Sequence, residues 1–148
     1  MTTSPQDTAV AWVALGSNVG NRTQALACLR AELQRAGVVI EAASSEILTR
    51  ALGVTAQEDF HNQVVRLRAP EPWTPDGWLT HCKRAEQRCG RRETYRWGPR
   101  VADADVVLLG ENGEITVNRD DLTVPHAELN HRPYLARLLG ELGVALPK

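Results

Sequence analysis

The order of secondary-structure signals along the chain constrains its fold more than any other feature. Two stretches carry helix-start and helix-stop signals: residues 22–36, which follow Asn21, and residues 74–89, which end before Gly90. Apolar or alternating runs typical of strands cover residues 9–15, 38–49, 60–67 and 101–109. The resulting order, β-α-β-β-α-β, predicts an α+β fold of the ferredoxin-like kind, an antiparallel sheet with both helices on one face.

The size and composition of the chain fit one soluble domain. Its 148 residues suffice for a single core, and its hydrophobic content of 43% is typical of a globular protein. A helical pattern over residues 133–142 predicts a C-terminal extension of a domain spanning residues 1–148. The polar residues 1–8 are expected to be disordered.

Charge and hydropathy argue against membranes and nucleic acid. The net charge of −1 gives no overall attraction to anionic polymers or lipid surfaces. Apolar runs stay well short of the roughly 20 residues that span a bilayer, and the start lacks a signal-peptide pattern. We therefore expect a cytoplasmic protein.

The cysteines are odd in number and widely spaced. Cys28, Cys82 and Cys89 form no C-x-x-C motif. We expect free thiols in a reducing compartment and no zinc site.

An aspartate pair stands on the last strand-like run. Side chains at i and i+2 of a strand share a face, so Asp103 and Asp105 would project together while Ala102, Ala104 and Val106 face a core. Adjacent carboxylates repel unless a cation lies between them, and Mg²⁺ takes oxygen ligands. The pair indicates a magnesium site, with a structural accident as the alternative.

A basic segment precedes this pair. Between Lys83 and Arg100 there are seven Lys/Arg and two Glu, a local balance of +5. Guanidinium groups bind phosphate oxygens in bidentate fashion. The chain lacks G-x-x-x-x-G-K-[ST] and G-x-G-x-x-G, so side chains and metal would have to hold a nucleotide. A solvated basic loop is the alternative interpretation.

Three aromatic residues and a histidine are further candidates. Trp97 lies in a polar loop, where its indole is suited to cover a flat heterocycle. Phe60 and Tyr134, taken singly, are more typical of a core. His126 follows a proline and is either a loop residue or a donor to phosphate.

Four segments then occur in a recognisable order. They are Ala14–Arg22 (ALGSNVGNR), Asp59–Val64 (DFHNQV), Arg96–Asp105 (RWGPRVADAD) and Leu122–His126 (LTVPH) followed by Arg132. Together they resemble the 6-hydroxymethyl-7,8-dihydropterin pyrophosphokinase family of folate biosynthesis, over about Ala9 to Leu139. The resemblance implies the same ferredoxin-like fold, and transfer of pyrophosphate from ATP to the pterin hydroxymethyl oxygen with release of AMP.

The resemblance also implies a role for each residue of the site. Asp103 and Asp105 would hold two Mg²⁺ ions and, with Arg92 and Arg100, would be the catalytic residues. The ATP-binding residues would be Glu86, Arg91, Arg92, Arg100, Leu122, Thr123, His126 and Arg132. The pterin-binding residues would be Thr49, Leu52, Phe60, Asn62, Trp97 and Tyr134. We expect a monomer that binds these two substrates and neither nucleic acid nor membrane.

The chain departs from the family pattern in three places. Arg50-Ala51 stands where prolines are usual, Ala102 and Ala104 replace leucines, and Glu93 occupies a position where a base is common. Two alternatives stay open: a degenerate member that binds pterin or nucleotide without turnover, and an RNA-binding ferredoxin-like module. The aromatic-rich strand pattern of RNA-recognition modules is missing from the sequence.

Overall fold

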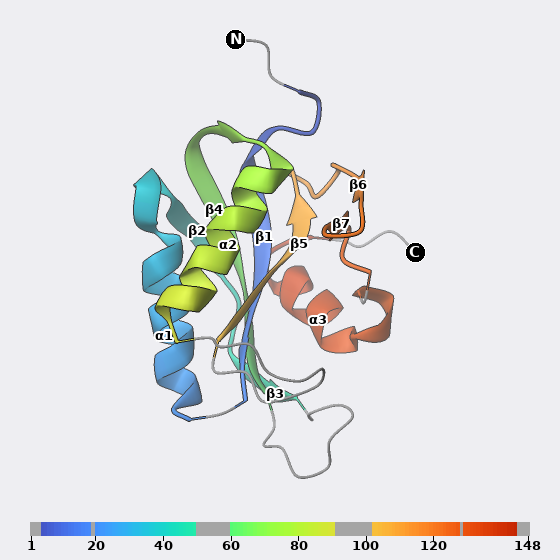
Figure 1. The fold of residues 1–148 in the computed structure, drawn as a ribbon. Coiled ribbons are helices and arrows are strands. Elements are labelled where there is room, and N and C mark those ends of the chain that lie inside the picture. Colours follow the sequence, from blue (N-terminus) through green and yellow to red (C-terminus); the bar gives the residue numbers. More distant parts are fainter. Residues whose placement is uncertain (1–3, 19, 50–59, 91–101, 128, 145–148) are drawn as a thin grey trace.

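The computed structural model describes residues 4–18, 20–49, 60–90, 102–127 and 129–144. Its elements in chain order are β1 (Thr8–Ser17), α1 (Arg22–Leu33), a 3₁₀ turn (Arg35–Gly37), β2 (Val39–Ala43), β3 (Ile47–Thr49), β4 (Phe60–Trp73), α2 (Pro75–Arg88), β5 (Asp103–Leu109), β6 (Val117–Asn118), β7 (Thr123–Val124), a second 3₁₀ turn (Leu129–His131) and α3 (Pro133–Glu141). The predicted mixed α/β class, with an antiparallel sheet, is confirmed (Figure 1).

The main sheet is built around the long strand β4. Its order is β2-β4-β1-β5, and β3 pairs with the other end of β4; all these pairings are antiparallel. β6 and β7 form a separate hairpin. This order places β5, the strand that carries the aspartate pair, at one edge of the sheet.

The predicted strand over residues 38–49 is wrong as a single strand. It is divided into β2 and β3 at Ser44, whose hydroxyl Oγ accepts a hydrogen bond from the Val64 amide at 2.9 Å. The Gln63 side chain also donates to the Ser44 carbonyl oxygen at 2.8 Å. Side chains thus replace part of the regular backbone ladder at this point.

Helices cover both faces of the sheet. α1 and α2 pack on one face through a core that includes Leu29 and Trp78, as predicted for the two central helices. α3 lies on the opposite face, where Leu138 packs in a second core with Trp12 (Figure 1).

The helix caps behave as the sequence predicted. The Asn21 side chain accepts from the Gln24 amide at the start of α1, and Thr74 Oγ1 accepts from the Gly77 amide at the start of α2, both at 3.0 Å. α1 ends earlier than predicted, because Ala36 adopts a positive φ of 58° within the following 3₁₀ turn.

A turn precedes the first strand. The Asp7 amide donates to the Ser4 carbonyl at 2.9 Å, and Thr8, the first residue of β1, is buried. The expectation of disorder for residues 1–8 stays a prediction.

The cysteine prediction is also corrected. Cys28 on α1 and Cys89, the residue that ends α2, form a disulfide with a Cα–Cα distance of 5.8 Å. The two residues are 61 apart in sequence, so only the packing of α1 against α2 brings them together. Cys82 is a buried thiol, and burial raises its pKa.

Within the described ranges, no helix is long and apolar enough to cross a membrane.

Candidate active site

Strand β5 presents the aspartate pair as the two-residue period predicts. Asp103 and Asp105 are half-buried, whereas Ala102, Ala104 and Val106 are at most 4% exposed and belong to the core under α1 and α2. The alternation therefore directs apolar side chains into the core and both carboxylates to the other side of the strand.

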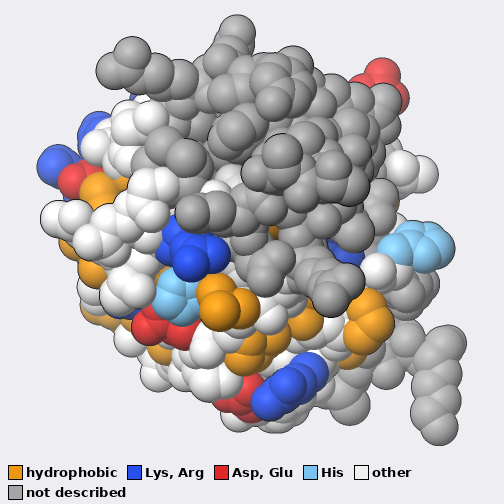
Figure 2. Space-filling model, turned by 90° about the horizontal axis from the view of Figure 1, so that it is seen from below, with side chains coloured by type: hydrophobic (Ala, Val, Ile, Leu, Met, Phe, Trp, Pro, Cys, Tyr) orange, Lys and Arg blue, Asp and Glu red, His pale blue; other side chains and the backbone are white. Residues whose placement is uncertain are grey.

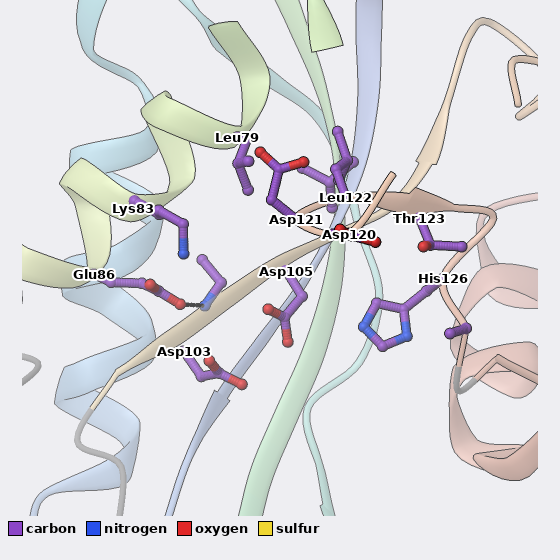
Figure 3. Close-up of a pocket in the computed structure, with 13 residues that line it drawn as sticks. Leu79, Lys83, Glu86, Asp103, Asp105, Asp120, Asp121, Leu122, Thr123 and His126 are labelled. Carbon is purple, nitrogen blue, oxygen red and sulfur yellow. Dashed lines mark hydrogen bonds between the residues drawn. The ribbon is translucent and has the colours of Figure 1, made fainter. Parts of the chain in front are cut away.

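Glu86 brings a third carboxylate to the pair. Donor oxygens of Glu86, Asp103 and Asp105 all lie within 4.8 Å of one another. Glu86 Oε2 accepts from the Ala104 amide at 2.7 Å, which ties α2 to the edge strand (Figure 3). Three hard oxygen donors this close together fit a Mg²⁺ ion.

A cavity of about 290 Å³ opens next to this cluster (Figure 3). Its walls come from α2, β5 and the segment 120–127. The lining residues are Leu79, Lys83, Glu86, Asp103, Ala104, Asp105, Val106, Asp120, Asp121, Leu122, Thr123, His126 and Ala127. Six of the residues predicted for metal or nucleotide thus meet in one place: Glu86, Asp103, Asp105, Leu122, Thr123 and His126.

His126 is positioned by its backbone. Its amide donates to the Val107 carbonyl at 3.0 Å, which fastens the segment after β7 to β5. The imidazole lines the cavity across from Asp105 (Figure 3).

Seven lining residues were not predicted as site residues, and four of them, Leu79, Lys83, Asp120 and Asp121, carry the larger side chains. Leu79 and Lys83 precede Glu86 on α2 at positions i, i+4 and i+7, so helix periodicity from Glu86 would have identified them. Asp120 and Asp121 carry no comparable local signal, because the turn between β6 and β7 was not predicted.

The cavity has a strongly acidic lining. Five carboxylates face it, and Lys83 is the sole Lys or Arg among the described residues that line it. Such a surface repels a bare phosphate chain but attracts one that arrives with a divalent cation.

A second group of predicted residues gathers on β3 and β4. Thr49 pairs with Phe60, and the Asn62 side-chain amide donates to Thr49 Oγ1 at 2.7 Å and to the Phe60 carbonyl at 3.2 Å. The pairing of β3 with β4 therefore fixes the orientation of the Asn62 amide.

Gly16 on β1 connects this group to the carboxylates. It pairs with Asn62 on one side and with Asp103 on the other, so the Cα atoms of Asn62 and Asp103 lie two strand spacings apart, about 10 Å. A Cβ at Gly16 would stand 3.4 Å from Asn62 Oδ1 and 3.6 Å from the Phe60 ring, so glycine leaves the surface beside both side chains open.

Tyr134 and Arg132 complete the described part of the site. Burial raises the pKa of Tyr134; the Arg132 charge opposes this shift, and the charges of Asp105 and Asp103 add to it. Arg132 Nη1 donates to the Tyr134 hydroxyl at 3.4 Å, and its Nε is buried without a hydrogen-bond partner in the described part of the chain. A buried guanidinium N–H of this kind is suited to bind an anionic oxygen.

Five predicted residues, Leu52, Arg91, Arg92, Trp97 and Arg100, lie outside the described residues. Figure 2 views the end of the molecule at which β3 lies, where hydrophobic side chains are exposed among charged ones. The β3 residue Leu48 is 61% exposed.

A cluster of carboxylates that faces a cavity beside an antiparallel sheet is typical of enzymes that act on nucleotides with the help of a divalent metal ion. The 7,8-dihydro-6-hydroxymethylpterin-pyrophosphokinase (HPPK) family model matches residues 12–143, and the chain belongs to this family.

Relatives at similar levels of identity agree with this family. The 2-amino-4-hydroxy-6-hydroxymethyldihydropteridine pyrophosphokinase of Bacillus subtilis is 32% identical over 137 residues, covering 90% of this chain and 77% of that protein. The protein of the same name from Synechocystis is 34% identical over 139 residues, covering 93% and 68%. The folate synthesis bifunctional protein of Pisum sativum, a mitochondrial protein, is 36% identical over 135 residues. The chain covers only 25% of that pea protein.

Proposed function

We propose that the protein transfers pyrophosphate from ATP to 6-hydroxymethyl-7,8-dihydropterin and releases AMP, as an enzyme of folate synthesis. The observation that carries this proposal is the short separation between two different groups. The carboxylate cluster suits a Mg²⁺-bound triphosphate. Phe60 and Asn62 on β4, two strands away, and Thr49 on the adjoining β3 offer an aromatic face and polar edge groups for a flat heterocycle.

The reaction requires positioning more than covalent chemistry. The hydroxymethyl oxygen forms a bond to the β-phosphorus, the bond from that phosphorus to the oxygen shared with the α-phosphate breaks, and AMP keeps that oxygen. The hydroxyl proton passes to solvent. Transfers of this kind depend on alignment and charge neutralisation, so a nucleophilic side chain is not needed.

Asp103 and Asp105 are the proposed holders of Mg²⁺, with Glu86 beside them. Bound Mg²⁺ would supply positive charge against the phosphate oxygens. We propose two ions, because a pair of carboxylates and a triphosphate together offer enough oxygen ligands for both.

On the nucleotide side, the proposal assigns the phosphates to cationic residues and the nucleoside to the far part of the cavity. Arg132 would offer its buried Nε to a phosphate oxygen. His126 would meet the phosphates from the wall of the cavity. Leu122 and Thr123 would lie against the nucleoside. The phosphate roles of Arg91, Arg92 and Arg100 stay predictions from the sequence.

On the pterin side, Phe60 and Tyr134 would stack on the two faces of the ring, and Asn62, oriented by Thr49, would hydrogen-bond its edge. Contacts from Leu52 and Trp97 stay predictions.

Four statements about the whole protein also stay predictions: the ferredoxin-like assignment, the single domain, the monomeric state and the cytoplasmic location.

The test is a comparison of Asp103→Asn and Asp105→Asn with the unaltered protein. Each variant should lose AMP formation from Mg²⁺, ATP and the pterin by more than about 100-fold while keeping the melting temperature, because only charge is removed. Glu71→Gln, an exposed change at the far end of β4, is the matched control. Undiminished activity in both aspartate variants would refute the metal assignment.

The degenerate-member alternative predicts a different outcome. In that case the unaltered protein would gain thermal stability from Mg²⁺-ATP or pterin but release no AMP.

A further inference from the structure

We propose that a second small-molecule site lies on the side of α2 that faces α1, and that it binds an aromatic ring joined by a short chain to a carboxylate. This site is a different cavity from the candidate active site, so it does not depend on the proposed function. Four features of the described residues support it: the cavity itself, an aromatic wall, a glycine and a cationic side chain.

The cavity has a volume of about 520 Å³ and opens where α1 ends, β4 ends and α2 begins. These three ends lie at the same end of the molecule (Figure 1). A volume of this size is in the range of sites that bind small molecules. The lining residues that bear on the choice of ligand are Trp73, Asp76, Gly77, Thr80, His81 and Arg84.

The helix α2 separates this cavity from the candidate active site. Leu79, Lys83 and Glu86 line the active-site cavity and form one stripe of the helix. Gly77, Thr80, His81 and Arg84 form another stripe, on the opposite side of the same helix. One helix thus serves two cavities.

Trp73 and His81 form an aromatic wall. Their ring centroids are 5.0 Å apart and their planes meet at 72°. The fully buried Trp78 supports Trp73 from the core, with ring centroids 4.7 Å apart. Trp73 itself is only half-buried, so part of a rigid indole surface is left for a flat ring to pack against.

Gly77 keeps the cavity open beside Trp73. A Cβ at this position would stand 3.4 Å from Thr74 Oγ1 and 3.5 Å from Trp73 Cβ, which are ordinary contact distances, and Gly77 has no positive φ. Glycine lowers the stability of a helix relative to alanine. The fold therefore does not require glycine here, whereas a ligand that lies along this side of α2 does.

Arg84 supplies the positive charge at the other end of the cavity. Arg84 follows Gly77 by seven residues, or about 10 Å along the helix axis, which leaves room for a ring beside Trp73 and a short chain. The Arg84 side chain is exposed, and no carboxylate among the described residues forms an ion pair with it. A guanidinium group binds a carboxylate through two parallel hydrogen bonds.

The other titratable groups of the cavity leave Arg84 as its cation. The Asp76 carboxylate is occupied, since its Oδ1 accepts from Arg119 Nη2 at 2.6 Å. Burial lowers the pKa of His81, so its ring is neutral at pH 7 and adds no charge. An anionic group on the ligand is therefore favoured at the Arg84 end.

The test is an NMR titration of the full chain with naphthylacetate, because backbone amide shifts report the place of binding as well as the dissociation constant. Naphthylacetamide, which has the same ring without the charge, is the control ligand. Arg84→Gln removes the cation, and Gly77→Ala adds a Cβ beside the aromatic wall. Arg88→Gln, an exposed change one turn further along α2 and outside the cavity lining, is the matched control.

We expect saturable shifts at the amides of Gly77, Thr80 and Arg84. Arg84→Gln should weaken the binding of naphthylacetate by about 5-fold, and naphthylacetamide should bind the unaltered protein more weakly by a similar factor. Gly77→Ala should weaken binding by about 5-fold or more without lowering the urea midpoint. Arg88→Gln should change the affinity by less than about twofold.

Several results would overturn the second site. Shifts confined to β3 and β4 around Asn62 would assign the probe to the proposed pterin site instead. A titration without saturation, equal affinities for the acid and the amide, or an unchanged affinity in Arg84→Gln or Gly77→Ala would each contradict the proposal. So would a loss in Arg88→Gln as large as that in Arg84→Gln.

Discussion

Glu86 joins the helix α2 to β5, the strand that carries the aspartate pair. Glu86 is only 6% exposed, and its Oε2 accepts a hydrogen bond from the backbone amide of Ala104. β5 is the edge strand among the described strands, so none of these pairs with this amide on that side. Glu86 thereby holds the backbone between Asp103 and Asp105 in place.

Two substitutions separate this structural contact from the charge of Glu86. Glu86→Ala should lower the free energy of unfolding by about 1–3 kcal/mol, because the buried Ala104 amide loses its acceptor. Glu86→Gln keeps an acceptor oxygen and should retain most of the stability while losing Mg²⁺ affinity. Urea unfolding and Mg²⁺ titration measure the two effects. Equal stability of Glu86→Ala and the unaltered protein would show that the contact is unimportant.

At the residue scale, the sequence predicts the position of a side chain where that position follows from the repeat of a strand or helix. Asp103 and Asp105 share a face because strands repeat every two residues, and the structure agrees. Asp121 was missed because its place in the cavity depends on an ion pair between Arg119 and Asp76, 43 residues apart in sequence. No local pattern encodes such a contact.

At the scale of elements, the packing of α1 against α2 is reinforced at two points. The Cys28–Cys89 disulfide joins the middle of α1 to the end of α2. His81 on α2 makes a second link, with its Nε2 at 2.7 Å from the carbonyl oxygen of Leu33, the last residue of α1.

The disulfide should stabilise the protein substantially. A cross-link that closes a loop of 61 residues is worth about 4 kcal/mol in the chain-entropy account. Cys28→Ser should therefore lower the free energy of unfolding by about 2–4 kcal/mol under non-reducing conditions. Ala27→Ser, an exposed change on the same helix, is the control. If reductant leaves the urea midpoint of the unaltered protein unchanged, the disulfide is not formed in solution.

His81 should make stability depend on pH. Burial lowers the pKa of His81. The hydrogen bond to the Leu33 carbonyl partly opposes this shift, whereas the positive charges of Arg88 and Arg84 add to it. The unfolded chain therefore takes up a proton near pH 6.5 while the folded protein does not. The free energy of unfolding should fall as the pH is lowered from 7.5 to 5.5.

Urea unfolding at the two pH values measures this effect. His81→Gln should reduce the fall, whereas His131→Gln, at an exposed position after β7, should not. A fall of the same size in His81→Gln would assign the pH dependence to other groups.

Element boundaries were predicted where caps define them and missed where side chains redirect the backbone. Asn21 and Thr74 start their helices as expected. The interruption between β2 and β3 depends on the Ser44 hydroxyl bonding to Val64, 20 residues away in sequence. A residue-by-residue strand pattern contains no sign of that bond.

At the scale of the whole molecule, the site lies at the edge of the sheet where three parts of the chain meet. β5 supplies Asp103 and Asp105, α2 supplies Glu86, and the segment after β6 supplies Asp121 and His126 (Figure 3). The order of strands and helices was predictable from the sequence, but the approach of the β6–β7 hairpin to α2 was not, since both of its strands are only two residues long. The cavity forms where this hairpin and the residues after it lie against α2 and β5.

The most direct test of pyrophosphoryl transfer is the identity of the nucleotide product. The unaltered protein is incubated with Mg²⁺, ATP and 6-hydroxymethyl-7,8-dihydropterin, and the nucleotides and pterins are separated and identified by mass spectrometry. We predict AMP and a pterin that has gained two phosphoryl groups, in equal amounts, with no ADP. Formation of ADP with a singly phosphorylated pterin, or no consumption of ATP at all, would contradict the proposed function.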